Sequence, residues 1–295
     1  MKLKKVIGHV LIAVGICIPL QAFTQICIND MHSENQYSEY RHQYMEANKK
    51  DNNSKESKED SITREERLKE EIDEYDARLS QGDGIVDPFV ADDYKSEYGI
   101  AGIDPNAIFG YLLIPSIDVK KPIWLDATYK HLDRGVAHVY GTSLPTGGKG
   151  RRAVIAGHRG WYRDIMLLNL GKVKNGDKVY IDRNGKVLTY VVKGRQIITP
   201  SEWQKLRPIS GKDMLTLLSC EPIIPPSPYR LLINCERVVD NVDEKQLNFN
   251  QIDKKMANEK NIPSQVSYVF YIITLVGWIL LLYRIYRLVL EIRKK

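Results

Sequence analysis

The pattern of apolar and polar positions marks both ends of the chain as apolar. The opening MKLKK precedes VIGHVLIAVGICIPLQAF, about 18 mostly apolar residues, the length at which a membrane span becomes possible. Near the other end, Val266 to Tyr283 holds no charged residue and is followed by a basic segment. We expect a membrane anchor or signal peptide at residues 1–28, a transmembrane helix at 265–283 and a basic cytoplasmic tail at 284–295.

Two details of these ends refine the expectation. Ala22-Phe23-Thr24 is a poor small-x-small cleavage site, which favours a retained anchor over a cleaved signal peptide. Basic residues lie outside both apolar stretches, and such residues face the cytoplasm. Two spans with both ends inside place residues 30–262 outside the cell membrane.

Residues 29–81 divide into a polar stretch and a patterned one. Glu46 to Asp60 has almost no apolar residue and predicts a solvated linker. Leu68, Ile72, Tyr75 and Leu79 then recur at spacings of four, three and four, which is one face of an amphipathic helix. We expect that face to pack on the domain, because about two heptads are too few for a stable coiled coil.

Beyond Gly82 the pattern changes to short β-rich runs separated by Gly, Pro, Asn and Asp. Many short strands with little helix predict a closed barrel or a sandwich. Arg183-Asn184-Gly185-Lys186 lies between two of the runs and predicts a hairpin turn. The predicted strands are IFGYLLIP, KKPIWL, RAVIAGH, KVYI, KVLTYVVKGRQII, MLTLLSC and YRLLINCERV.

Composition narrows the function. Charged residues make up 27% of the chain and the net charge is +6, but the basic residues gather at the termini, where they suit membrane flanks rather than nucleic acid. The chain has four cysteines, too few for a disulfide scaffold and without metal-ligand spacing. Cys17 and Cys27 belong to the first apolar stretch, which leaves Cys220 and Cys235 for the globular part.

Three residues of the β-rich region together indicate nucleophilic chemistry. Cys220 ends a predicted strand before Glu-Pro, Arg230 opens the next strand, and His158 ends another in AGHRG. A neighbouring cation or imidazole favours the thiolate, an arginine can hold an oxyanion, and a histidine can protonate a leaving amine. His138 in HVYG is a second candidate base. Cys235 is expected on the strand face opposite Arg230, as a core or surface thiol.

These motifs resemble those of the sortase family. Thr216-Leu217-Leu218-Ser219-Cys220 with Arg230 resembles the TLxTC…R signature, and His158 in GHRG resembles the family's histidine. HVYGTSLPTGG, at 138–148, and Asp87-Pro88-Phe89 are similar to a segment and a lid motif of the class C, pilin-polymerising sortases. Ser219 stands where the family usually has threonine, and the loop after Cys220 is unusually rich in proline, which leaves the sorting-signal preference open.

The resemblance implies a fold and its divisions. We expect a mainly β protein: a closed eight-stranded sortase-type β-barrel with short helices, an N-terminal helical and lid region, and terminal transmembrane helices. The lid would cover residues 82–95, the catalytic barrel 96–245 and a second linker 246–264. Asp87 would pair with Arg230, and Phe89 would cover Cys220.

The resemblance also implies an activity. A sortase is a cysteine transpeptidase that cleaves an LPxTG-like sorting signal between Thr and Gly through a thioacyl enzyme, with Thr216 and Ser219 in the substrate-binding strand. No metal or organic cofactor is implied. The expected partners are LPxTG-type pilin or surface proteins, with a pilin lysine as acceptor for pilus assembly, or lipid II for wall anchoring, at a Gram-positive-type cell surface. The alternative with a different kind of function is a membrane-anchored binding module whose catalytic site is degenerate.

Overall fold

The structure is a computed structural model that describes residues 2–51, 55–79, 84–89, 94, 96–101, 103–160, 164–238, 254, 257–259 and 265–293. The chain divides into two compact units. One comprises Met1–His32, Gly160–Ile165 and Ile262–Lys295, and the other comprises Ser33–Arg159 and Met166–Asn261. The larger unit contains the β-rich region, and each unit is described by itself.

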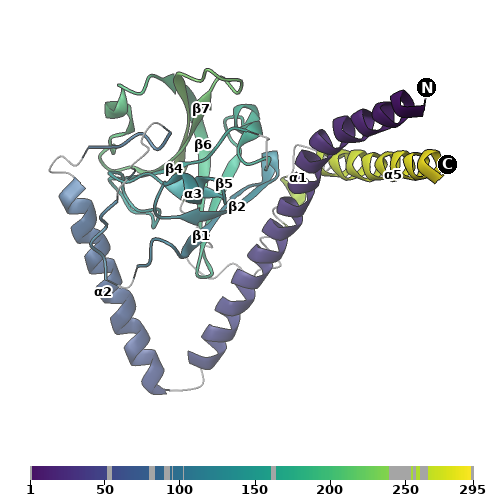
Figure 1. The fold of residues 1–295 in the computed structure, drawn as a ribbon. Helices are drawn as coiled ribbons and strands as arrows, with labels where there is room; N and C mark the ends of the chain where they lie inside the picture. Colours follow the sequence, from purple (N-terminus) through teal and green to yellow (C-terminus); the bar gives the residue numbers. More distant parts are fainter. Residues whose placement is uncertain are drawn as a thin grey trace. The chain divides into compact units, whose positions relative to one another are not determined.

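Eight strands of the larger unit close into a barrel (Figure 1). Around the barrel their order is β1-β2-β3-β4-β7-β8-β6-β5. The implied eight-stranded barrel is therefore confirmed, and the sandwich alternative is wrong. The strands are β1 (Ile108–Ile114), β2 (Val119–Trp124), β3 (Val136–His138), β4 (Arg151–Ala156), β5 (Lys178–Arg183), β6 (Lys186–Ile198), β7 (Asp213–Glu221) and β8 (Tyr229–Arg237).

β3 is the strand that the pattern of the chain does not predict. It has three residues and pairs in parallel with β2 through Val136 and Ala137. On its other side it pairs antiparallel with β4. Three residues are too few to display an alternation of apolar and polar positions, so local pattern cannot identify such a strand. β4 and β7 form a second parallel pair, and this pair carries the candidate site.

The predicted hairpin turn joins β5 to β6. Asn184 and Gly185 both have positive φ values, 48° and 72°. Two consecutive residues of this kind make the tight turn whose twist matches the flanking strands, and Asn-Gly is the pair that adopts it at least cost. The prediction from Arg183-Asn184-Gly185-Lys186 is confirmed.

A compact apolar core fills one part of the barrel, and the strands that lead to the candidate site contribute side chains to it. Val154 and Ala156 of β4, Leu218 of β7 and Leu232 of β8 are fully buried in it. β4 and β7 run parallel from Arg151 opposite Asp213 to Ala156 opposite Leu218. Burial on the inward face fixes the register, because a slip of one residue would turn every inward side chain outward.

Two helices precede the barrel, α1 (Lys2–Asp51) and α2 (Lys55–Leu79). Ile72 and Tyr75 of α2 are buried in a cluster with Tyr98, Phe109 and Leu125, so the predicted amphipathic face does pack on the domain. The solvated linker expected from Glu46 to Asp60 differs from the structure, which has helical backbone on both sides of residues 52–54. Lys- and Glu-rich sequence cannot supply a core, but these residues are good helix formers.

The smaller unit contains the first part of α1 and the whole of α5 (Gln265–Arg293). Two stretches, Val6–Tyr44 and Tyr268–Arg293, are long and apolar enough to cross a membrane. Trp278 Nε1 donates a hydrogen bond to Thr24 Oγ1 at 3.2 Å, and the Leu20 side chain packs against Gly277. Contacts of this kind, a small residue and a polar pair, are those that hold helices together in lipid.

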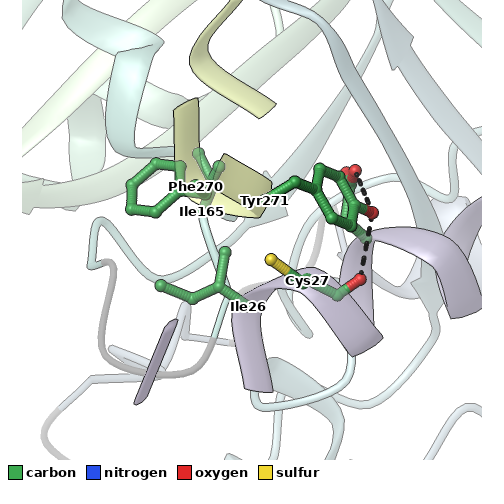
Figure 2. A pocket seen from close by; sticks show the side chains of 6 residues that line it. Ile26, Cys27, Ile165, Phe270 and Tyr271 are labelled. Atoms are coloured by element: carbon green, nitrogen blue, oxygen red, sulfur yellow. Dashed lines mark hydrogen bonds between the residues drawn. The ribbon is translucent and has the colours of Figure 1, made fainter. Parts of the chain in front are cut away.

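A small apolar hollow lies within this unit (Figure 2). Tyr271 donates from its hydroxyl to the Cys27 carbonyl oxygen at 3.2 Å and to Asp30 Oδ2 at 3.4 Å, on one side of the hollow. Residues Ile26, Ile165 and Phe270 complete its lining. None of the candidate site residues lines this hollow, since all of them belong to the larger unit.

Candidate active site

Cys220 and Arg230 lie directly opposite one another on neighbouring antiparallel strands. They form a register pair next to the end of the β7–β8 ladder, where Glu221 pairs with Tyr229. Cys220 is partly exposed, whereas Arg230 is only 3% exposed. Side chains directly opposite on such a pair lie on the same face with their Cβ atoms about 5 Å apart. Because their strands are adjacent and antiparallel, the two side chains face one another next to the loop that joins β7 to β8.

The guanidinium of Arg230 is held by hydrogen bonds on several sides. Its Nη2 lies 2.8 Å from Asp87 Oδ2 and its Nε lies 3.1 Å from the same oxygen. Its Nη1 donates to the carbonyl oxygens of Ser227 and Tyr229 at 3.0 and 2.9 Å. The expected pairing of Asp87 with Arg230 is present, in the forked geometry that makes arginine–carboxylate contacts strong.

Phe89 occupies the space between Arg230 and His158. Its ring centroid lies 5.8 Å from that of His158 and 5.3 Å from Arg230 Cζ. The turn is closed by the Phe89 amide, which donates to Asp87 Oδ1 at 3.0 Å, and by Tyr129, whose hydroxyl donates to the Phe89 carbonyl at 3.2 Å. Pro88 between them is buried. Asp87-Pro88-Phe89 therefore contacts two of the three candidate catalytic side chains.

A glycine of the 138–148 segment lets the chain before this turn approach closely. Gly141 has φ of 85°, and a Cβ there would lie 2.9 Å from the Gly84 carbonyl oxygen. A larger residue would be strained by its φ and would displace the backbone of residues 84–85. Ile85 and Phe89 also pack on the barrel core. Of the lid expected over residues 82–95, positions 82–83, 90–93 and 95 lie outside the described residues.

His158 follows β4 by two residues and is flanked by aromatic rings. Its ring lies 6.3 Å from the Tyr129 ring in a stacked orientation, and its Nε2 lies 3.7 Å from Asp133 Oδ1. Burial lowers the pKa of His158, and the Asp133 carboxylate opposes that effect only partly. The imidazole is therefore held neutral near pH 7, in the form that can accept a proton.

The thiol of Cys220 lies among charges of both signs. Burial raises its pKa, Arg230 and Arg159 lower it, and Asp87 raises it. Burial is the largest of these effects, so the resting thiol is protonated. Removal of the Asp87 carboxylate would leave Arg230 free to favour the thiolate.

Arg159 and Glu221 are a feature of the site that reasoning from the sequence missed. Each directly follows a candidate catalytic residue in the chain, and their side chains form an ion pair. Arg159 Nη1 also lies 3.5 Å from the Cys220 carbonyl oxygen. The signal that could have revealed the pair is the presence of opposite charges next to both His158 and Cys220.

The second candidate base, His138, is fully buried, and both of its ring nitrogens have partners. Nδ1 lies 2.9 Å from the Tyr98 hydroxyl, and Nε2 lies 2.9 Å from the Ser143 carbonyl oxygen. Burial lowers the pKa of His138 to about 4. An imidazole enclosed in this way is a structural element of the interior, which leaves His158 as the candidate base.

The two residues expected to bind substrate are also enclosed. Thr216 and Ser219 are fully buried. Thr216 Oγ1 donates to Asn234 Oδ1 at 3.0 Å, and Ser219 Oγ donates to the Gly157 carbonyl oxygen at 2.7 Å. These contacts fix β7 against its two neighbours, and the substrate-binding role stays a prediction.

Cys220 and Cys235 are free thiols, and Cys235 is fully buried. Of the two alternatives for Cys235, core or surface, the structure has the core. Within the described part of the chain, no three His, Cys, Asp or Glu residues are grouped so that they could hold a metal ion. The chemistry that this geometry offers is that of a thiol, an imidazole and a guanidinium.

The fold is a closed β-barrel, and its candidate site combines a cysteine and an arginine near the end of the β7–β8 ladder with a histidine that follows β4. The model of the sortase domain matches residues 112–238. Sortase C-3 from Streptococcus pneumoniae is 42% identical, with 59% of this chain and 83% of that chain covered and a TM-score of 0.55. The chain belongs to the sortase family.

Other members of the family are similar over comparable regions. Streptococcus agalactiae sortase C1 is 33% identical, with 60% of this chain and 88% of that chain covered and a TM-score of 0.53. Sortase A of Bacillus anthracis is 31% identical over 125 residues, 42% of this chain and 58% of that protein. The chain thus spans somewhat more than half the length of that curated relative.

Proposed function

We propose that this protein is a cysteine transpeptidase that cleaves an LPxTG-like sorting signal between Thr and Gly and transfers the acyl group to an amine. The observation that carries the proposal is the pairing of Cys220 with Arg230 beneath a segment that also touches His158. A partly exposed thiol, a neutral imidazole and a fixed cation are the groups that acyl transfer through a thioester requires.

In the first half of the reaction, the Cys220 sulfur attacks the carbonyl carbon of the threonine. The thiol proton passes to the neutral imidazole of His158, and Arg230 stabilises the developing oxyanion. His158 then gives the proton to the departing glycine amine, and the carbon–nitrogen bond breaks. The product of this half is a thioester between Cys220 and the threonine carbonyl.

In the second half, the acceptor amine attacks the thioester. His158 removes a proton from the amine, the new amide bond forms, and Cys220 leaves as thiolate and receives that proton from His158. The same imidazole therefore acts as a base toward the thiol, as an acid toward the departing amine and as a base again toward the acceptor amine, and its lowered pKa keeps it in the neutral form that starts this sequence.

Arg230 must be free to hold the oxyanion, so we infer that Asp87-Pro88-Phe89 is a lid that moves before substrate binds. In the closed state the Asp87 carboxylate occupies the forked face of Arg230, and Phe89 lies against His158. Opening would break the Asp87–Arg230 ion pair and withdraw Ile85 and Phe89 from the barrel core on which both pack.

The acceptor we propose is a pilin lysine, which makes the protein a class C sortase for pilus assembly. Support comes from the Asp-Pro-aromatic turn over Arg230 and from the similarity to proteins named sortase C. One such protein is described as belonging to a group B Streptococcus pilus island, and another by its pilin substrate specificity. Lipid II as acceptor, for wall anchoring, is the second candidate, since the chain is also similar to proteins named sortase A.

We further propose that the catalytic barrel lies outside the cell membrane, anchored by both terminal helices. The basic residues beyond each apolar stretch support this orientation. Sorting signals and pilin lysines would then meet the site on the outer side of the membrane.

The test uses the full chain in detergent micelles, an LPxTG peptide and a lysine-containing acceptor peptide. We expect cleavage and a mass adduct with the parent protein, and loss of both in Cys220→Ala. The matched control is Cys235→Ala, which removes a buried thiol of the same barrel and should leave cleavage intact. Equal behaviour of the parent and Cys220→Ala would exclude the enzyme and favour a binding module with a degenerate site.

Product analysis separates the two acceptors. With a pilin that carries the signal and a candidate lysine, a pilus-assembling enzyme should form a ladder of covalent polymers on denaturing gels. A wall-anchoring enzyme should instead join the peptide to lipid II and leave the pilin monomeric.

A further inference from the structure

His158 follows β4 and Cys220 lies near the end of β7, and these two strands are parallel neighbours. We call residues 157–159 the His158 arm and residues 219–221 the Cys220 arm. The distance between the two arms must be held by contacts beyond the strand ladder. The regular β4–β7 pairing ends at Ala156 opposite Leu218. One more backbone bond, from Gly157 N to the Leu218 carbonyl oxygen, follows at 3.1 Å. Past that point the segments that follow β4 and end β7 no longer pair with each other as strands. The proposed chemistry nevertheless needs the side chains of His158 and Cys220 at a constant separation.

The Ser219 hydroxyl, which donates to the Gly157 carbonyl oxygen at 2.7 Å, makes the next connection between the two arms. Beyond it, charged side chains connect them. Arg159, one residue after His158, forms an ion pair with Glu221, one residue after Cys220. The Arg159 side chain is 6% exposed and that of Glu221 is 20% exposed, so solvent screens the pair little. Arg159 Nη1 also lies 3.5 Å from the carbonyl oxygen of Cys220 itself. The pair therefore joins both arms beyond the end of the strand ladder.

The surroundings of Arg159 are shaped to receive its guanidinium. A Cβ on Gly171 would overlap Arg159 Nη2, so the absence of a side chain there leaves the space that the guanidinium fills. Arg195 also contacts Gly171, because its Nη1 donates to the Gly171 carbonyl oxygen at 3.2 Å. Burial and this neighbouring cation both lower the pKa of Arg159. Glu221 supplies the opposite charge with which this buried guanidinium pairs.

We propose that Arg159 and Glu221 are a positioning pair, which fixes the His158 arm against the Cys220 arm and holds the Arg159 charge beside a fixed carboxylate. The proposal rests on the transpeptidase function proposed above. Neither residue needs to touch the substrate: Arg159 acts through the position of His158 and the Cys220 backbone, and Glu221 acts through Arg159.

The Arg159 charge affects the protonation of the Cys220 thiol, which an ion pair with a purely stabilising role would not do. Arg159 favours the Cys220 thiolate, as Arg230 does. Each of these two cations has its own carboxylate, Asp87 for Arg230 and Glu221 for Arg159. One carboxylate belongs to the proposed lid and can leave, whereas Glu221 belongs to β7 and stays. Opening the lid would therefore expose one cation and not the other.

The experiment compares the full chain in detergent with Arg159→Gln, Glu221→Gln and the double variant. Two quantities are measured: kcat and KM for peptide transfer, and the pH midpoint of Cys220 alkylation, followed by the mass of the Cys220 peptide. All three variants should lose about 10- to 100-fold in kcat with little change in KM, because a displacement of about 1 Å can cost 10²-fold.

The pH midpoint of Cys220 alkylation should distinguish the effect of the Arg159 and Glu221 charges on the thiol from their effect on the position of the two arms. Glu221→Gln leaves Arg159 unpaired and should move the midpoint to lower pH, whereas Arg159→Gln removes a cation and should move it to higher pH. The double variant should return the midpoint toward that of the parent while kcat stays low. Gly171→Ala displaces the guanidinium without changing any charge, so it should lower kcat through position alone.

Glu236→Gln is the matched control, because Glu236 pairs with Lys212 elsewhere on the same β7–β8 sheet and lies outside the site. It should change neither kcat nor the midpoint. The proposal is overturned if the single variants keep the parental kcat, or if they lower the melting temperature without moving the midpoint. A parent that does not cleave the peptide would instead overturn the proposed function, and the midpoints would still report on the pair.

Discussion

At the scale of single residues, the site is governed by which charges and rings are allowed near Cys220. Arg230 and Arg159 favour the thiolate, while burial and Asp87 oppose it. His158 is kept neutral by burial among Tyr129 and Phe89. The resting site therefore holds its proton on the Cys220 sulfur, and the Asp87 carboxylate adds to the effect of burial.

Neutralising that carboxylate tests the role of the turn at 87–89. In Asp87→Asn, the pKa of Cys220 should fall, because the mutation removes a negative charge that raises it and frees Arg230. Alkylation of Cys220 at neutral pH should become faster than in the parent. Phe89→Ala should also speed alkylation, by uncovering the site without a change of charge.

The control for these variants is Asp104→Asn, which removes the carboxylate of a different turn, where Asp104 accepts a hydrogen bond from Asn106. It should leave the alkylation rate unchanged. Parental alkylation rates in both Asp87→Asn and Phe89→Ala would mean that the turn does not control access to the thiol.

His138 makes the stability of the barrel depend on pH. Its pKa is about 4 in the folded protein, below the ordinary value of 6.5, because it is buried. The unfolded chain therefore binds a proton at pH values where the folded chain does not, and the free energy of unfolding should decrease as pH falls from 6.5 to 4. The loss from this group should approach roughly 3 kcal/mol at the lower end.

Denaturant unfolding at a series of pH values measures this effect on the full chain. His138→Gln should be less stable at neutral pH, because it disturbs the contacts with Tyr98 and Ser143, but its stability should vary less between pH 6.5 and 4. A parent whose unfolding free energy is flat across that range would contradict the assignment of His138 as a buried neutral imidazole.

At the scale of elements, α2 is attached to the barrel by one face. The four residues spaced along the helix at 68, 72, 75 and 79 all meet the cluster that holds Tyr98 and Phe109. Tyr75 also donates from its hydroxyl to the Thr142 carbonyl oxygen at 3.2 Å. Since the 138–148 segment also approaches the backbone at Gly84, this packing connects the helix to the region of the lid.

Truncation of that face should destabilise the barrel. Ile72 is 4% exposed, so Ile72→Ala should reduce the free energy of unfolding by about 2–4 kcal/mol through lost burial and a cavity. Glu74→Ala, at an exposed position of the same helix, should change it by less than about 0.5 kcal/mol. Equal and small effects of the two variants would indicate that α2 is not part of the folded unit in solution.

At the scale of the whole molecule, the two ends of the chain form a unit of their own. Leu20 of α1 packs on Gly277 of α5, and Thr24 and Cys27 of α1 accept hydrogen bonds from Trp278 and Tyr271 of α5. The retained anchor, rather than a cleaved signal peptide, stays a prediction that these contacts make testable.

Cross-linking in membranes tests this pairing. With Cys17 and Cys27 replaced by serine, Leu20→Cys with Gly277→Cys should form a disulfide under mild oxidation, which a shift in gel mobility without reductant would detect. Leu11→Cys with Gly277→Cys is the control, since Leu11 is 66% exposed. Equal cross-linking of both pairs, or a mature chain that lacks residues 1–28, would contradict the pairing.

Several features of this protein are determined by the sequence alone, because their cause is local. Short β-rich runs between turn residues predict seven of the strands, the 68–79 spacing predicts the face of α2, and Asn184-Gly185 predicts its turn. The sequence indicates that Cys220 can face Arg230 if their two strands are neighbours, and the structure supplies that adjacency. For the strands, the helix face and the turn, neighbours in the chain carry the information.

Other features were decided only by the tertiary structure, because their cause lies in residues far apart in the chain. β3 exists through its partners on β2 and β4, and His138 is neutral because Tyr98 and Ser143 enclose it. The sequence does not reveal that Arg159 reaches Glu221 across 62 positions. Local pattern specifies which segments are strands and which side chains can react, whereas long-range packing sets the charges, distances and burial that decide how they react.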